Sequence, residues 1–104
     1  MEGGVPEKPV VVSDQFKKSR QNVYVDAGLY LDKILEALNT LPIYYNVYPE
    51  CRHIVTKSRM YRNIILDSHL IVYRITDCRI EVLDIIHAAS SMNRIKRTRR
   101  IKIE

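Results

Sequence analysis

The spacing of apolar residues changes along the chain, from the three-to-four-residue period of helices to the two-residue period of strands. Three valines at residues 10–12 predict a short strand, and Ser13 or Asp14 directly after them is suited to cap a helix that begins at Gln15. Leucine and isoleucine then recur at helical spacing over residues 29–41. The first half therefore predicts a strand followed by two helices.

Turn-forming residues mark the ends of these two helices. Asp26-Ala27-Gly28 is expected to end the first helix, and Pro42 is expected to end the second because proline has no backbone N–H. Phe16 and Val23 are the apolar contacts of the first helix, which otherwise carries a solvent-facing polar string. We expect a helical hairpin with its apolar stripe facing inward.

The second half predicts an antiparallel meander. Residues 61–66, 69–76 and 79–87 are rich in isoleucine, valine and leucine and are separated by short turns, and residues 51–56 are a possible further strand. Together with the hairpin, these strands predict an α+β domain in which the helices cover one face of a small antiparallel sheet. The other face is expected to stay open, as a platform for nucleic acid or for an acidic partner segment.

The length of 104 residues and the hydrophobic content of 46% fit a single domain. We expect a loose leader at residues 1–8, a domain over residues 9–92 and a basic tail over residues 93–104. The sequence has neither a signal-peptide pattern nor an apolar run near the roughly 20 residues of a membrane helix, which predicts a cytoplasmic protein without membrane contact. Cys51 and Cys78 are far apart and belong to no ligand cluster, so we expect reduced thiols, no metal and no cofactor.

The net charge of +5 is unevenly distributed. Residues 1–50 carry five Lys and Arg against seven acids, whereas residues 51–104 carry twelve against five. The tail is the densest basic segment, and such a pattern attracts polyanions or an acidic protein. Three structures fit this tail: a segment that tracks RNA, an alternating strand that extends the sheet, or a mobile segment that waits for an acidic partner.

Three segments of the second half, taken in order, resemble the RelE/ParE toxin superfamily. One strand begins with Tyr61-Arg62, the next contains Val72-Tyr73-Arg74, and the last ends in His87-Ala88. The helical hairpin also lies where the superfamily has one, so the resemblance spans roughly residues 10–92. It implies a RelE/ParE-like fold and the toxin of a type II toxin–antitoxin pair, a plasmid-stabilisation system in which a cognate antitoxin binds the toxin in a hetero-oligomer.

The resemblance implies two possible targets. RelE-like members cut mRNA on the ribosome without a metal, and ParE-like members inhibit DNA gyrase. Ser90 and Leu70 stand where RelE carries arginine. A metal-free mRNA interferase is the first expectation, with gyrase inhibition, or an inactive member that still binds its antitoxin, as the alternatives.

Metal-free RNA cleavage needs a base, an acid and cations around one phosphate. The candidate catalytic residues, by residue type and by the resemblance, are His87, His69, Asp67, Arg62 and Tyr73. The candidate cations for binding RNA or the antitoxin are Arg59, Arg74, Arg94, Lys96, Arg97, Arg99, Arg100 and Lys102. Structural roles compete with these: Arg62 and Arg74 could form cross-strand ion pairs with Glu81 or Asp84, and Tyr73 could be half core with its hydroxyl at the rim.

Overall fold

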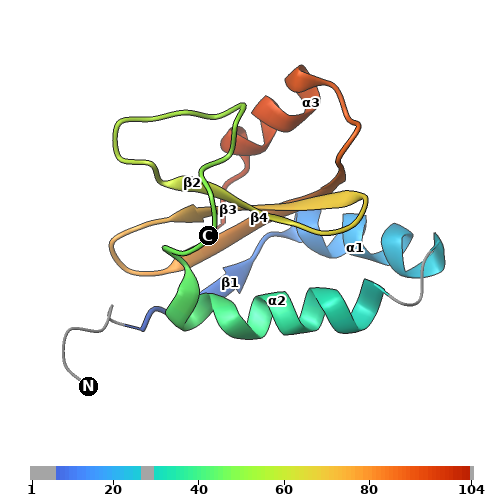
Figure 1. The fold of residues 1–104 in the computed structure, drawn as a ribbon, viewed down its shortest axis with the longest axis horizontal. Helices are drawn as coiled ribbons and strands as arrows, with labels where there is room; N and C mark the ends of the chain where they lie inside the picture. The colour runs from blue at the N-terminus through green and yellow to red at the C-terminus, as the bar shows by residue number, and fades with distance from the viewer. Residues whose placement is uncertain (1–6, 27–29, 104) are drawn as a thin grey trace.

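A four-stranded sheet forms the middle layer of the molecule (Figure 1). The structure is a computed structural model that describes residues 7–26 and 30–103. The strands lie in the order β1-β4-β3-β2. Their bounds are β1 (Val10–Val12), β2 (Tyr61–Ile65), β3 (His69–Ile75) and β4 (Ile80–His87). The helices are α1 (Asp14–Asp26), α2 (Tyr30–Tyr44), α3 (Met92–Lys96) and the 3-10 helix η1 (Arg97–Arg100).

The sheet combines an antiparallel meander with one parallel strand. β2, β3 and β4 are paired antiparallel in sequence order, which confirms the predicted meander. β1 pairs parallel with β4, so the first strand of the chain lies beside the last strand of the sheet. A register shift between Val72 and Tyr73 interrupts the pairing of β3 with β4. The fold is the expected α+β arrangement of the RelE/ParE type.

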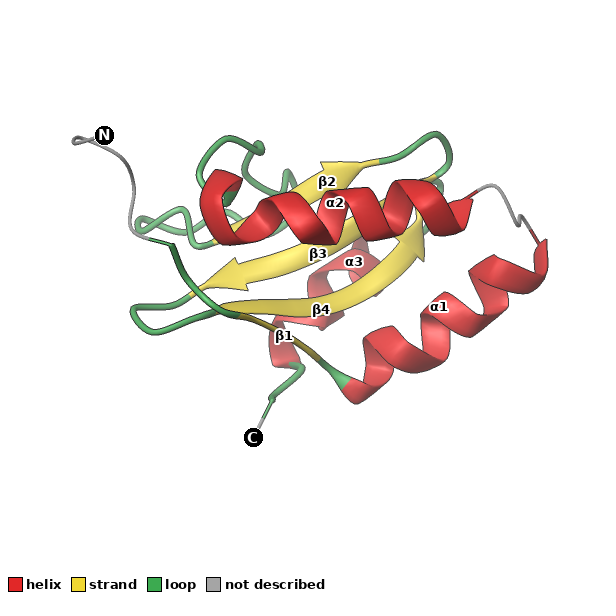
Figure 2. Ribbon diagram, turned by 90° about the horizontal axis from the view of Figure 1, so that it is seen from below, coloured by secondary structure: helices red, strands yellow, loops and turns green. Residues whose placement is uncertain are grey.

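α1 and α2 cover one face of the sheet (Figure 2). Ser13 caps α1, because its Oγ accepts the Phe16 N–H at 2.9 Å, and the same hydroxyl donates to the Leu83 carbonyl of β4. Phe16, Ile34 and Leu41 are fully buried in the core between the helices and the sheet. The inward-facing stripe of the hairpin is therefore confirmed. α1 begins one residue earlier than predicted, at Asp14.

The prediction that Pro42 ends the second helix is wrong. α2 continues to Tyr44 and contains Pro42 in its last turn. The missing N–H of a proline removes one helical hydrogen bond, and this loss is tolerated where the helix ends two residues later. The Pro42 carbonyl accepts the Lys8 N–H at 3.1 Å, which joins the end of α2 to the segment before β1. Residues 27–29, at the predicted break between the helices, and residues 1–6 of the predicted leader lie outside the described residues.

The prediction of an open second sheet face is also wrong. Residues 51–56 form turns instead of a strand, and Glu50 makes an isolated bridge with Arg62. Cys51 and Ile54 are both buried, and the Ile54 N–H bonds to the Cys51 carbonyl at 3.1 Å. Burial three residues apart fits a turn, whereas a half-buried strand would alternate. This loop and the C-terminal segment cover the face together, in a second apolar cluster.

The C-terminal segment is helical and packs on the sheet. Ser91 caps α3 by accepting the Arg94 N–H at 3.2 Å. Ile95 and Thr98 are buried three residues apart, and the Thr98 hydroxyl donates to the Ile95 carbonyl at 2.7 Å. A period of three places these two residues against the sheet and leaves Lys96, Arg97, Arg99 and Arg100 exposed, so the alternating strand is not formed. No helix in the described part of the chain is long and apolar enough to cross a membrane.

Candidate functional site

His69 and His87 face each other at the end of two neighbouring strands. They are paired in the register of β3 and β4, and their ring centroids lie 5.2 Å apart in an edge-to-face contact. His87 is exposed, and its Nδ1 accepts the Ala89 N–H at 3.1 Å, whereas His69 is half-buried with Nδ1 3.2 Å from the Ser68 hydroxyl. The structure thus brings together two of the predicted catalytic residues, and His87 is the exposed member of the pair.

Asp67 lies in the turn between β2 and β3, close to this pair in sequence. Its carboxylate forms a 2.7 Å ion pair with Lys33 of α2, and both side chains are largely exposed. The ion pair ties the turn to the helical hairpin. Within residues 7–26 and 30–103, no group of three His, Cys, Asp or Glu side chains is arranged to hold a metal ion.

Arg62 binds backbone carbonyl groups on the helix-covered face of the sheet. Its Nη1 donates to the carbonyls of Asn46 and Tyr48 at 3.0 and 2.8 Å, and its Nε donates to the Arg59 carbonyl at 3.0 Å. Arg59 has a φ of 54°, an uncommon left-handed conformation for a residue other than glycine. Arg62 therefore fixes the loops on either side of β2, and the cross-strand ion pair considered from the sequence is not the contact it makes.

Tyr73 is fully buried, so its hydroxyl is not at the rim. The hydroxyl donates to the Tyr45 carbonyl at 2.6 Å, and the ring packs edge-on against Tyr48. Burial raises the pKa of this phenol well above its ordinary value, an effect that the nearby Arg62 opposes only in part. Tyr73 is placed as a core residue that fastens the connector after α2.

Arg74 makes the cross-strand ion pair that the sequence suggested. Its Nε donates to Glu81 at 2.7 Å, and Arg79 binds the other oxygen of the same carboxylate at 2.8 Å. The remaining donors of the two arginines bond to the carbonyls of Ile101 and Ile103 in the C-terminal segment, at 3.1 and 2.7 Å. Burial alone would raise the pKa of Glu81, but the hydrogen bonds and charges of the two arginines lower it overall.

Arg94 is also paired within the protein. Its guanidinium lies 3.0 Å from the carboxylate of Asp84, which is completely buried on β4. Together with the pair of arginines on Glu81, this contact fastens the C-terminal segment to the sheet. We call these two groups the C-terminal clamp: Arg74, Arg79 and Glu81, and Arg94 with Asp84.

Other predicted cations are exposed on the C-terminal segment. Arg97, Arg100 and Lys102 point outward, whereas Lys96 and Arg99 line a hollow of about 760 Å³. The opposite wall of this hollow is the loop before β2, which contributes Arg52 and His53. Arg52 was not among the residues that the sequence suggested, because nothing local to the possible strand at residues 51–56 places it beside the C-terminal segment. The apolar spacing of Cys51 and Ile54 was the signal that could have found this exposed turn.

The comparisons with known proteins agree with this fold. A family model described as the ParE toxin of the type II toxin–antitoxin system parDE matches residues 10–92, which include β1–β4, α1 and α2. No curated protein matches the chain. ParE toxins pair with a cognate antitoxin. The chain therefore belongs to the ParE toxin family, within the RelE/ParE superfamily, and is the toxin of a type II toxin–antitoxin system.

Proposed function

We propose that this toxin arrests growth by inhibiting DNA gyrase and not by cutting mRNA. One observation carries the proposal: the side chains predicted for RNA cleavage do not meet in one accessible site. Tyr73 is buried, and the guanidinium groups of Arg62 and Arg74 already bind carbonyls and a carboxylate of the protein.

The positions of the remaining groups support the same proposal. Side chains alternate between faces along a strand, so His69 and His87 lie on the same face as Ile71 and Ile85, which belong to the core under α1 and α2. Lys96 and Arg99 lie on the segment that covers the opposite face. A cleavage site needs its proton-transfer groups and its cations around one phosphate. Here the sheet separates them.

The positions where RelE carries arginine also favour a target other than RNA. Leu70 packs against the apolar cluster under the C-terminal segment, and Ser90 donates its backbone N–H to the His87 carbonyl at 3.0 Å. Neither side chain supplies a positive charge to the end of β4. Inhibition of a protein target needs a complementary surface and no such charge, and gyrase is the protein target known for ParE-like toxins.

The contact between His69 and His87 favours one second candidate function. Two imidazoles in contact, one of them exposed, can act as the acid and base of a metal-free RNA cleavage. This alternative predicts that both rings are needed for toxicity. The gyrase proposal predicts that they are not.

A pulse-labelling experiment separates the two functions. Wild-type protein and the variant H69Q/H87Q are induced briefly in bacteria, and incorporation of labelled methionine and labelled thymidine is followed at equal protein levels. We expect thymidine incorporation to fall first, equally for both proteins. An early fall in methionine incorporation that the double substitution abolishes would overturn the proposal in favour of mRNA cleavage. No fall in either label with wild-type protein would contradict both functions.

A further inference from the structure

We infer that the hollow between the loop before β2 and the C-terminal segment is a docking groove for an acidic, apolar-rich segment of the cognate antitoxin. We call it the basic groove, and its charged and aromatic lining residues are Arg52, His53, Tyr61, Lys96 and Arg99. The inference rests on the pairing of ParE toxins with an antitoxin and not on the choice between gyrase and mRNA as the target.

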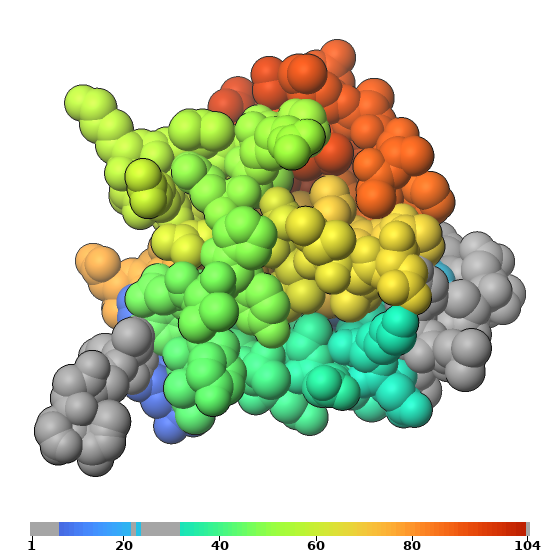
Figure 3. Space-filling model, viewed as in Figure 1, coloured from blue at the N-terminus to red at the C-terminus, as the bar shows by residue number. Residues whose placement is uncertain are grey.

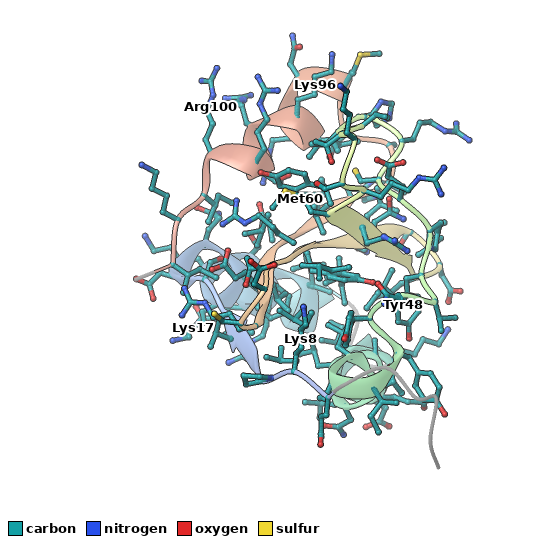
Figure 4. All side chains as sticks on the ribbon, turned by 90° about the vertical axis from the view of Figure 1, so that its left-hand side faces the viewer. Lys8, Lys17, Tyr48, Met60, Lys96 and Arg100 are labelled. Carbon is teal, nitrogen blue, oxygen red and sulfur yellow. The ribbon has the colours of Figure 1, made fainter. Side chains whose placement is uncertain are left out.

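Two segments that are distant in the sequence form the walls of the basic groove. In Figure 3, the loop of residues 50–60 and the C-terminal segment lie beside each other above the sheet. Figure 4 shows Lys96 and Arg100 on the C-terminal segment, with Met60 below them. The Arg74 guanidinium of the C-terminal clamp donates to the Arg99 carbonyl at 3.3 Å. The backbone that carries the Arg99 side chain is therefore fixed before any partner arrives.

The cations of the basic groove differ from the arginines of the C-terminal clamp in having no carboxylate partner among the described residues. Arg74, Arg79 and Arg94 are paired with buried carboxylates. Among the residues that the structure describes, no carboxylate pairs with Arg52, Lys96 or Arg99. Three unpaired positive charges around one hollow attract a partner that carries several carboxylates.

The floor and rim of the basic groove are apolar. Ile54 is buried in the floor beside Tyr61 and Met60, whereas Val55 and Met92 are 71% and 53% exposed at the rim. Exposed methionine and valine side chains bury apolar area when a partner covers them, and methionine adapts its shape to different partners. The groove therefore suits a segment in which acidic side chains alternate with apolar ones.

The lining favours a polypeptide over single-stranded nucleic acid. Sequence-tolerant binding of single strands uses exposed aromatic faces on which bases stack. Tyr61 and His53 carry the two aromatic rings among the groove residues, and the Arg74 guanidinium lies 5.7 Å from the Tyr61 ring centroid and 3.3 Å from the Tyr61 hydroxyl. The Tyr61 ring already contacts this cation, which leaves the smaller His53 ring as a stacking surface, and the apolar residues of the groove are aliphatic or contain sulfur. Because the toxin carries a net charge of +5, acidic side chains on a polypeptide partner would also strengthen its binding.

Charge reversal in the basic groove tests the inference. The purified toxin is titrated with its purified, full-length cognate antitoxin, and binding is measured by calorimetry. The variant R52E/K96E/R99E is expected to lose affinity on the order of 100-fold, and the neutral variant R52Q/K96Q/R99Q about 10-fold. The control K17E/K18E/K33E makes the same change in net charge at exposed positions on α1 and α2, outside the groove, and we expect a loss below about threefold. Circular dichroism confirms that each variant is folded.

Three outcomes would overturn the inference. They are a wild-type protein that does not bind the antitoxin, groove variants that bind as tightly as wild type, and a control variant that loses as much affinity as R52E/K96E/R99E. A short single-stranded RNA serves as a second probe. If the groove variants weaken RNA binding while antitoxin binding stays unchanged, the groove is a nucleic-acid site instead. These readouts measure binding alone, so their failure is distinct from a failure of the gyrase proposal.

Discussion

The two faces of the sheet are covered by different means. The helix-covered face is closed by apolar packing of α1 and α2, with Phe16, Ile34 and Leu41 fully buried. The opposite face has a smaller apolar cluster, and its cover is fastened by the C-terminal clamp, in which arginines bind Glu81, Asp84 and carbonyls of the C-terminal segment.

The helix-covered face contributes mainly to the stability of the fold, whereas the opposite face carries the groove proposed to bind the antitoxin. Apolar packing of α1 and α2 against the sheet stabilises the whole fold. The C-terminal clamp holds a cationic segment at the surface, where the basic groove forms along its edge. Perturbing each face in turn should therefore give effects of different size and kind.

The largest effect is expected for Phe16→Ala. Removing this fully buried ring leaves a cavity in the core under the helices and should reduce the free energy of unfolding by about 3–5 kcal/mol. Urea denaturation followed by circular dichroism measures the change. Ile34→Ala under the helices and Ile95→Ala in the smaller cluster remove the same atoms on the two faces, and Ile95→Ala should cost less, because a terminal segment can detach while the sheet stays folded. Equal losses from the two substitutions would contradict the contrast between the faces.

A smaller and more local effect is expected for Glu81→Ala. Two partly buried arginines lose their shared carboxylate, which should reduce the free energy of unfolding by about 2–3 kcal/mol. Hydrogen exchange should accelerate in residues 97–103 more than in α1 and α2. Glu81→Gln, which keeps a hydrogen-bond acceptor, should show a weaker form of the same pattern. Uniform acceleration over the whole chain would mean that the clamp does not act locally.

Acid should loosen the C-terminal segment selectively. The two arginines lower the pKa of Glu81 in the folded protein, so this carboxylate stabilises the fold above its unfolded pKa of about 4.3. The stabilisation is lost as pH falls from that value through the lowered pKa of the folded state. Hydrogen exchange of residues 97–103 measured on either side of this window should show the change in wild-type protein. The same difference in Glu81→Gln would exclude Glu81 as its source.

The smallest effect is expected for Tyr73→Phe. The substitution removes the buried hydroxyl that bonds to the Tyr45 carbonyl and should reduce the free energy of unfolding by about 1 kcal/mol. Growth arrest at equal levels of folded protein should not change. A loss of toxicity without a loss of stability would show that the hydroxyl acts on a substrate.

The helix-covered face could be predicted from the sequence because its signals are local. Ser13 before a polar string and leucines at helical spacing predict the hairpin, and short runs rich in isoleucine, valine and leucine between turns predict β2, β3 and β4. The cover of the opposite face depends on contacts between residues far apart in the chain, such as Arg79 with Ile103 and Arg74 with Ile101. The spacing of apolar residues in one sequence does not indicate which distant residues will be in contact.

The candidate site shows the same difference between local signals and contacts of distant residues. The strand pattern predicted β3 and β4, and their register brings His69 and His87 together, which RNA cleavage by the two histidines would require. The roles of Arg62 and Tyr73 depended on which backbone carbonyls lie nearby, and these belong to the connector after α2, whose path the sequence left open. Arg52 was missed because its loop gains its cationic neighbours only when the C-terminal segment folds over the sheet.

The most direct test of the proposed activity places both targets in one reaction. Purified toxin is added to DNA gyrase, relaxed plasmid and an intact mRNA with ribosomes, and supercoiling and mRNA length are followed together. Gyrase inhibition predicts that supercoiling stops while the mRNA keeps its length, for wild-type protein and for H69Q/H87Q alike. Shortened mRNA with normal supercoiling would contradict the proposal.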